Sequence, residues 1–119
     1  DRIRMPFNVS LPAQLACVEA LKDGAFVKRS VGMNDVQRAG LVRALSDAGF
    51  GVGDSATNFV FARSPLPGRE GFKALLRQGV IVRPLDEYGL SSHVRISVGS
   101  AAQNKALLAA LKQVLAVPA

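Results

Sequence analysis

The chain has 119 residues, a formal net charge of +6 and a hydrophobic fraction of 49%. That length suits one compact domain, and the apolar fraction supports a folded core rather than a disordered chain. The positive charge is spread out, with no Lys/Arg block and no closely spaced aromatic motif, so we expect no nucleic-acid partner. No apolar run reaches the length of a membrane span, so we also expect no membrane partner.

The sequence contains one cysteine, Cys17. A single cysteine cannot form an internal disulfide, which fits a reducing compartment, and we expect a cytoplasmic protein. Cys17 lies in a helical apolar pattern, so we interpret it as a small buried hydrophobic residue rather than a nucleophile. The first residue is Asp1 rather than Met, and "DRIRMPFNVS" reads as the middle of a longer protein, so we interpret the chain as a fragment.

Two helices are expected first. After an extended stretch with two prolines, Ser10 near an N-cap and Pro12 in a first turn predict a helix that begins at about residue 13. Asp23 and Gly24 end it. The apolar spacing then predicts a second, longer helix over residues 25–48, which the glycine-rich "DAGFGVG" segment ends.

Short strands and two further helices follow. Strands are predicted over residues 50–52, 58–63, 80–83 and 93–98, and helices over residues 69–78 and 101–115. We expect Pro84 to end the pairing of the third strand because proline has no N–H to donate. Ser100 and Gln103 predict a capping box on the last helix. The fold class is therefore α+β, a small sheet of about four short strands packed by helices and preceded by a long helical segment.

Two arginines lie in apolar, strand-like runs. The alternation in "VRISV" puts Arg95 and Ser97 on one face of a strand and the valines and isoleucine on the other, while Arg83 leaves from the end of another strand. A planar guanidinium binds a carboxylate or phosphate through two parallel hydrogen bonds. If the two strands are neighbours, both arginines can converge on one anion. The alternative is that each pairs with a local acid such as Asp86 or Glu87.

Other catalytic chemistry is sparse in the sequence. His93 is the only histidine, and a neutral imidazole at a strand edge explains it better than a catalytic role. No Cys/His cluster predicts a metal site, and no serine has a plausible histidine and acid partner. The adjacent carboxylates Asp86 and Glu87 fit a solvated turn. The chain by itself does not resemble a complete catalyst.

Three segments nevertheless resemble a known family: "RMPFNVSLPAQLACVEAL", "SATNFVFAR" and "GVIVRPLDEYGLSSHVRISVGSAAQN". They are similar to the C-terminal portion of histidinol-phosphate aminotransferases, pyridoxal-phosphate enzymes of the class-II aminotransferase group with the fold-type-I architecture. The resemblance runs in register from residue 4 to about residue 115. Two alternatives stay open: threonine-phosphate decarboxylase or another class-II aminotransferase, and a stand-alone anion-binding regulatory module.

The resemblance implies a domain organisation. Residues 1–119 would form the single small C-terminal domain, with residues 1–24 as the segment and helix that join it to an absent large domain. In this family the large domain carries the lysine that forms a Schiff base with pyridoxal 5'-phosphate. We assign none of the lysines here to that role and no catalytic residue to this fragment, so we expect the fragment alone to be inactive. The full-length enzyme would be a homodimer.

The resemblance also implies roles for individual residues. Arg95 matches the family arginine that binds the anionic group of the substrate, and Arg83 matches a second arginine near the same group. The reaction would move an amino group between glutamate/2-oxoglutarate and histidinol phosphate/imidazole acetol phosphate, in histidine biosynthesis. Asn58 and Tyr88 are softer matches. Each is a possible substrate contact. The alternative for Asn58 is a local hydrogen bond at the start of a strand, and the alternative for Tyr88 is packing within a loop.

Overall fold

The computed structural model describes residues 8–116 of the chain. The chain divides into two compact units between Gly32 and Met33, and we describe each unit by itself. This division does not test the assignment of residues 1–24 as a connecting segment, which stays a prediction. The extended stretch was expected at residues 2–12; residues 2–7 lie outside the described residues, and the helix already begins at Leu11.

The first unit contains helix α1 (Leu11–Lys22) and the beginning of α2 (Gly24–Asp47). Ser10 is the N-cap of α1 and Pro12 lies in its first turn, as the sequence predicted. Asp23 follows the end of α1 and also begins α2, because its Oδ1 accepts the Phe26 N–H at 2.8 Å. Within residues 8–116, no helix is long and apolar enough to cross a membrane.

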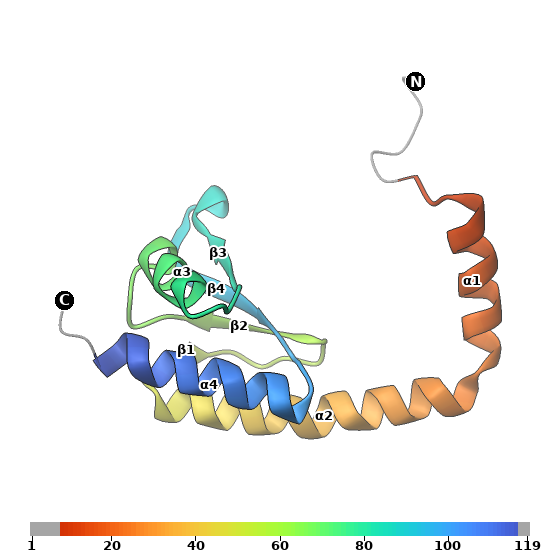
Figure 1. Cartoon of the computed structure of the whole chain (residues 1–119), viewed down its shortest axis with the longest axis horizontal. Helices are drawn as coiled ribbons and strands as arrows, with labels where there is room; N and C mark the ends of the chain where they lie inside the picture. The colour runs from red at the N-terminus through yellow and green to blue at the C-terminus, as the bar shows by residue number, and fades with distance from the viewer. Residues whose placement is uncertain (1–7, 117–119) are drawn as a thin grey trace. The chain divides into compact units, whose positions relative to one another are not determined.

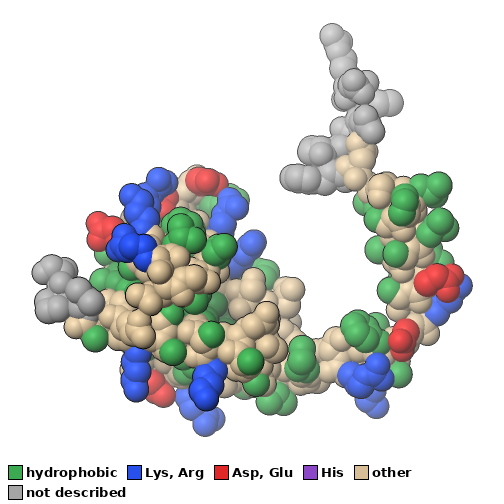
Figure 2. Space-filling model, viewed as in Figure 1, with side chains coloured by type: hydrophobic (Ala, Val, Ile, Leu, Met, Phe, Trp, Pro, Cys, Tyr) green, Lys and Arg blue, Asp and Glu red, His purple; other side chains and the backbone are tan. Residues whose placement is uncertain are grey.

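No residue of α1 is buried. Figure 2 shows hydrophobic side chains, in green, along this helix. Large apolar side chains here are more than half exposed, and they include Val9, Leu11, Leu15, Val18 and Leu21. The expectation that Cys17 is buried is therefore wrong, since Cys17 is exposed with the rest of the helix.

The second unit is built on a four-stranded antiparallel sheet in the order β1-β2-β4-β3 (Figure 1). Its strands are β1 (Gly51–Val52), β2 (Phe59–Arg63), β3 (Arg83–Leu85) and β4 (Leu90–Ser97). The helices that accompany them are α3 (Gly68–Arg77), α4 (Ala101–Ala116) and the second part of α2, beside which α4 runs. The predicted α+β class and the predicted order of elements are confirmed.

One hydrophobic core joins the sheet to all three of these helices. Buried side chains come from α2 and α4, from α3, and from one face of β2 and β4, and burying them removes apolar surface from water. The core consists of Leu41, Leu45, Phe50, Val60, Ala62, Leu75, Val82, Val94, Ile96, Leu107, Ala110 and Leu111. The opposite face of the sheet contributes none of these residues.

Two strand boundaries differ from the sequence prediction. The third strand was expected at residues 80–83, but β3 begins at Arg83 and continues through Pro84, which pairs with Val94. Because β3 is an edge strand, the missing N–H of Pro84 does not interrupt the ladder. The fourth strand begins at Leu90 rather than His93, since Leu90 pairs with Leu85 across a register shift.

Candidate anion-binding site

The register of β3 and β4 brings the two arginines together. Arg83 and Arg95 are direct partners across these antiparallel strands. Residues directly opposite each other in such a pair project from the same face of the sheet, with Cβ atoms about 5 Å apart. The two strands are therefore neighbours. Under the sequence-based prediction, this is what allows both guanidinium groups to reach one anion.

The alternation predicted for β4 is confirmed. Val94 and Ile96 are buried in the core, whereas Arg95 and Ser97 are exposed on the other face. In β2, Val60 and Ala62 are buried, and Phe59 and Phe61 lie on the face that carries Arg95. We call this second surface the open face, and it comprises Phe59, Phe61, Arg63, Arg83, His93, Arg95 and Ser97.

Arg95 lies against an aromatic ring. Its guanidinium carbon is 5.3 Å from the centre of the Phe59 ring, a cation–π contact that orients the group without neutralising its charge. The ion pairs in the described part of the chain do not include Arg95. Its hydrogen-bonding edge can therefore receive an external oxyanion.

Arg83 is paired differently. Its Nη2 donates to Glu87 Oε2 at 3.0 Å, so the local-acid alternative raised by the sequence holds for this residue. Glu87 lies in a 3₁₀ turn, η1 (Asp86–Tyr88), directly after β3. The neighbouring Asp86 does not take part, since its carboxylate is 3.9 Å from Arg69 instead. The two arginines of the site are thus unequal, and only one has a protein counter-ion.

The aromatic residues of the open face were not anticipated as site residues. The rings of Phe61 and His93 stack with their centres 5.0 Å apart and an angle of 13° between their planes. His93 lies within β4 rather than at its beginning, and its Nδ1 is buried with no hydrogen-bond partner among the described residues. The alternation in "NFVFAR" could have revealed both phenylalanines, because every second residue of a strand shares one face.

Side-chain hydrogen bonds fix the turn that leads into β2. Ser55 Oγ donates to the Phe59 carbonyl at 2.6 Å, and Thr57 Oγ1 donates to the same oxygen at 3.1 Å. From α2, Asn34 Nδ2 and Arg38 Nη1 both donate to the Thr57 carbonyl, at 3.2 and 3.3 Å. The backbone just before Phe59, whose ring lies against Arg95, is therefore held from α2 as well as by the turn itself.

A second set of bonds fixes the end of β4. Asn104 is buried, and it accepts from the Gly99 N–H at 3.0 Å and donates to the Gly99 carbonyl at 3.1 Å. Its amide also donates to Gln37 on α2 at 3.1 Å. The predicted capping box is confirmed, because the Ser100 N–H donates to Gln103 Oε1 at 2.8 Å and the Gln103 N–H donates to Ser100 Oγ at 3.4 Å.

Among the described residues, neither softer candidate makes a side-chain hydrogen bond to Arg83 or Arg95. Asn58 is exposed just before β2, where its carbonyl accepts the Val98 N–H, and the local side-chain bonds expected of it are made by Ser55 and Thr57. Tyr88 lies in η1 with 68% of its surface exposed, so packing within the loop does not explain it. A substrate role for either residue stays a prediction.

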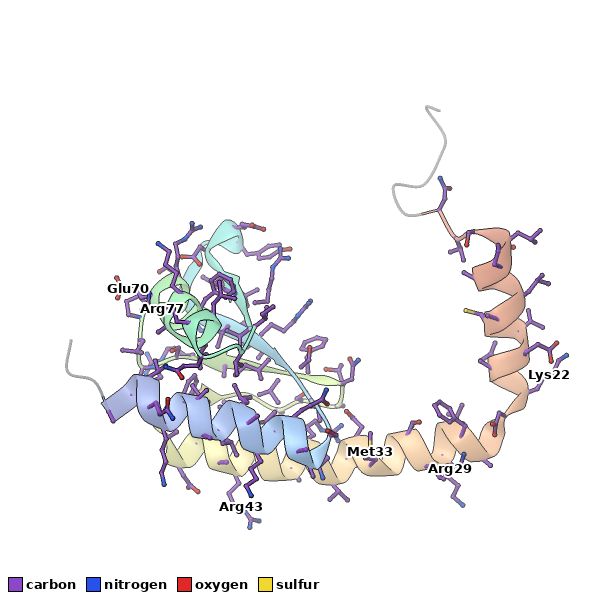
Figure 3. All side chains as sticks on the ribbon, viewed as in Figure 1. Lys22, Arg29, Met33, Arg43, Glu70 and Arg77 are labelled. Atoms are coloured by element: carbon purple, nitrogen blue, oxygen red, sulfur yellow. The ribbon has the colours of Figure 1, made fainter. Side chains whose placement is uncertain are left out.

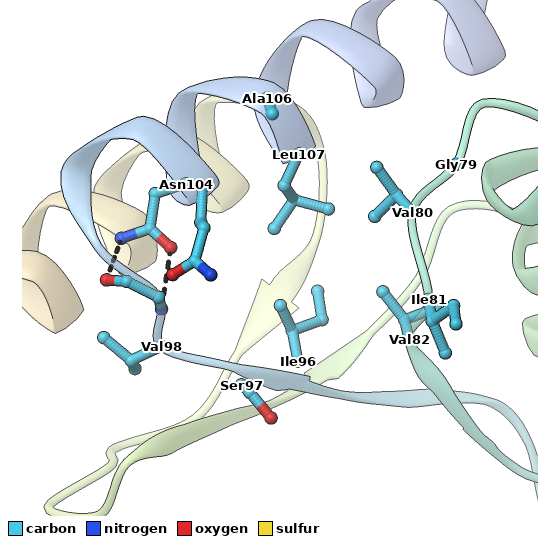
Figure 4. A pocket seen from close by; sticks show the side chains of 12 residues that line it. Gly79, Val80, Ile81, Val82, Ile96, Ser97, Val98, Asn104, Ala106 and Leu107 are labelled. Carbon is cyan, nitrogen blue, oxygen red and sulfur yellow. Dashed lines mark hydrogen bonds between the residues drawn. The ribbon is translucent and has the colours of Figure 1, made fainter.

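A separate cavity lies at the end of β4, where Ser97 is the open-face residue that borders it. It has a volume of about 510 Å³ and is bounded by residues 79–82, the end of β4 and the beginning of α4 (Figure 4). Its lining, as the structure describes it, is mainly apolar and includes no charged side chain, and neither Arg83 nor Arg95 belongs to it. The cavity is therefore not the anion site.

The residues present do not fit a site that holds pyridoxal phosphate. Every lysine of the chain lies on a helix, and none lies on the open face beside the arginines; they are Lys22, Lys28, Lys73, Lys105 and Lys112. Without a neighbouring amine the open face has no group for covalent attachment of the cofactor. Residues 8–116 also contain no cluster of three or more potential metal ligands.

Comparison with known proteins places the chain in a family. The family model described as aminotransferase class I and II matches residues 1–111. The chain belongs to this family. It is 39% identical over 114 residues to the histidinol-phosphate aminotransferase of Nitratidesulfovibrio vulgaris strain DP4, covering 96% of this chain but 31% of that protein. The chain thus spans about a third of the length of the curated relatives it matches.

Solved aminotransferases have the same arrangement of elements. The histidinol-phosphate aminotransferase of Clostridium acetobutylicum superposes with a TM-score of 0.81 at 27% identity, over 96% of this chain and 36% of that one. The enzyme of Sinorhizobium meliloti, in complex with pyridoxal-5'-phosphate, gives a TM-score of 0.76 at 27% identity over 96% and 32%. The resemblance read from the sequence motifs is confirmed, and so is the fold it implied.

Proposed function

We propose that this aminotransferase chain is the small C-terminal domain of a pyridoxal-phosphate-dependent histidinol-phosphate aminotransferase. Its role is to bind the anionic group of each substrate through Arg83 and Arg95. The observation that carries the proposal is the direct pairing of these residues across β3 and β4 on the open face. The names of relatives that the chain matches along nearly its whole length give independent support.

The proposed reaction moves an amino group between glutamate/2-oxoglutarate and histidinol phosphate/imidazole acetol phosphate. One site must therefore accept a carboxylate and a phosphate in turn. A guanidinium binds either oxyanion through two parallel hydrogen bonds, which a lysine ammonium cannot do. Pyridoxal phosphate would be held by another part of the polypeptide, where it would supply the electron sink for this chemistry. Arg83 and Arg95 orient the substrate from its anionic end.

The cofactor, its lysine and a large domain would belong to a part of the polypeptide outside this chain, and the whole enzyme would be a cytoplasmic homodimer. This division of labour agrees with helix-borne lysines and with an open face that carries arginines but no amine. By the same reasoning, the 119 residues alone should bind anions without transferring an amino group.

The test uses the longer protein that carries this chain with its cofactor domain. Losing one charge-assisted hydrogen-bonding group removes about 1.5–3 kcal/mol of substrate binding, so Arg95→Gln should lower kcat/KM about 10- to 150-fold for both substrates. Cofactor absorbance should persist, because Arg95 binds substrate. Arg43→Gln, on the exposed side of α2 (Figure 3), is the matched control and should leave kcat/KM unchanged.

Two outcomes would contradict the proposal. If Arg95→Gln removes the cofactor absorbance while substrate binding survives, Arg95 holds the cofactor. If the wild-type protein releases carbon dioxide from an amino acid phosphate and transfers no amino group, the threonine-phosphate decarboxylase alternative is correct.

A further inference from the structure

We propose that Glu87 is a specificity-determining residue that competes with the substrate anion for Arg83. This inference rests on the proposed function of the arginine pair. In the structure Glu87 Oε2 accepts a hydrogen bond from Arg83 Nη2 at 3.0 Å, one of the nitrogens that an external oxyanion would use. An anion that binds Arg83 through Nη2 must displace this carboxylate.

The local fold places Glu87, and not its neighbour Asp86, against Arg83. Glu87 lies four residues after Arg83, in the turn η1 that follows β3 directly. Gly89, with a φ of 74°, ends this turn in the left-handed conformation and returns the chain into β4. The adjacent Asp86 is directed to Arg69, so its carboxylate does not bind Arg83 in place of Glu87.

The ion pair is exposed enough to be displaced. The side chain of Arg83 is 50% exposed and that of Glu87 is 70% exposed. Exposed ion pairs contribute little net stability because water solvates both partners and long side chains lose freedom when paired. A ligand that offers more negative charge than one carboxylate can therefore take Arg83, whereas a ligand of equal charge gains little by doing so.

The two arginines then act in sequence. Arg95, on Phe59 and without an acid partner, offers the first contact to any oxyanion. A carboxylate is satisfied by that one bidentate contact. A phosphate dianion has a further charge and a third oxygen, so it draws Arg83 away from Glu87. Glu87 thereby reduces affinity for phosphate more than affinity for carboxylate, which brings two unlike substrates of one site closer in affinity.

The test titrates inorganic phosphate and acetate separately into the chain at constant ionic strength and mildly alkaline pH. Binding is followed by the NMR signals of the Arg83 and Arg95 Nε–H groups. Glu87→Gln should tighten phosphate binding about two- to fivefold, the range expected for release of an exposed ion pair. For acetate, the change in the logarithm of the dissociation constant should be less than about half of the change for phosphate.

A double-variant cycle isolates the route through Arg83. In an Arg83→Gln background, Glu87→Gln should leave phosphate binding within about 1.5-fold, because a screened surface charge acts weakly alone. Glu70→Gln, on α3 (Figure 3), removes the same charge elsewhere and should change nothing. An unchanged phosphate affinity in Glu87→Gln, or an equal gain without Arg83, overturns the role of Glu87.

Failure of the proposed function would look different. If Arg83→Gln and Arg95→Gln both bind phosphate as the wild type does, the arginine pair is not an anion site and both proposals fall. If both variants weaken phosphate binding but Glu87→Gln does not tighten it, only the inference about Glu87 falls.

Discussion

The two faces of the sheet are built from the same strands, but one face is buried in the core and the other is exposed. Val60, Ala62, Val94 and Ile96 on one face are at most 4% exposed and join helices α2, α3 and α4 in the core. The open face presents arginines and aromatic rings, and among them Arg95 and Phe61 are exposed. Because neighbouring residues of a strand point in opposite directions, the core and the proposed binding surface are encoded in alternate positions.

The comparison also explains how an exposed site can be well defined. Within the second unit the helices pack on the core face of the sheet, and that core fixes the strands of the open face from behind. The turn that leads into β2 is held by hydrogen bonds from α2 to the Thr57 carbonyl, and the end of β4 is held by Asn104. Substitutions on the core face should therefore lower the free energy of unfolding, and substitutions on the open face should lower the affinity for anions.

The largest expected effect is on the core face. Ile96→Ala removes a side chain that is 3% exposed and leaves a cavity under β4, which should lower the free energy of unfolding by about 2–5 kcal/mol. Urea denaturation followed by circular dichroism measures the change. Ser97→Ala, the next residue and exposed, is the matched control and should stay within about 0.5 kcal/mol of the wild type. Equal effects would mean that the two faces are not distinct.

The next effect concerns the contact of α3 with β4. A Cβ added to Gly68 would lie 2.9 Å from the His93 carbonyl oxygen and 3.1 Å from that of Ser91. Gly68→Ala should therefore destabilise the fold by about 1–3 kcal/mol, since strand backbone cannot easily move aside. Gly40→Ala in α2 meets nothing within 4 Å and should instead stabilise by about 0.5–1 kcal/mol. Thermal unfolding of both variants checks the opposite signs.

The smallest effect on stability is expected on the open face. Arg95→Gln loses the contact with Phe59 but leaves no buried group unpaired, so it should cost less than about 1 kcal/mol of unfolding free energy. Its loss of phosphate binding should be far larger in proportion. A variant that unfolds as readily as Ile96→Ala would show that Arg95 supports the fold rather than a ligand.

Local pattern was enough to predict much of the fold. The order of elements, the capping box of Ser100 and Gln103 and the two-sided character of β4 all follow from periodicity and end signals within a few residues. The start of β3 could not be predicted in this way. Val80 donates its N–H to the Leu75 carbonyl at the end of α3. The beginning of the apolar run at 80–82 is therefore bonded to the helix and not to a neighbouring strand.

The sequence selected the residues of the proposed site but could not predict how they pair. The sequence selected Arg83 and Arg95, but their direct opposition depends on the register of β3 and β4, which involves the shift after Pro84. The sequence also offered Asp86 and Glu87 equally as partners, and only the geometry of η1 separates them. Cys17 was misjudged because a helical apolar pattern predicts a buried face only where another element covers it.

The central claim is that one site on the open face receives both carboxylate and phosphate. Its most direct test is a phosphate titration of the protein, read at the Arg95 side chain, at increasing fixed concentrations of 2-oxoglutarate. If the two anions share the site, the apparent dissociation constant for phosphate should rise linearly with the 2-oxoglutarate concentration. A phosphate affinity that does not change with 2-oxoglutarate would contradict the claim.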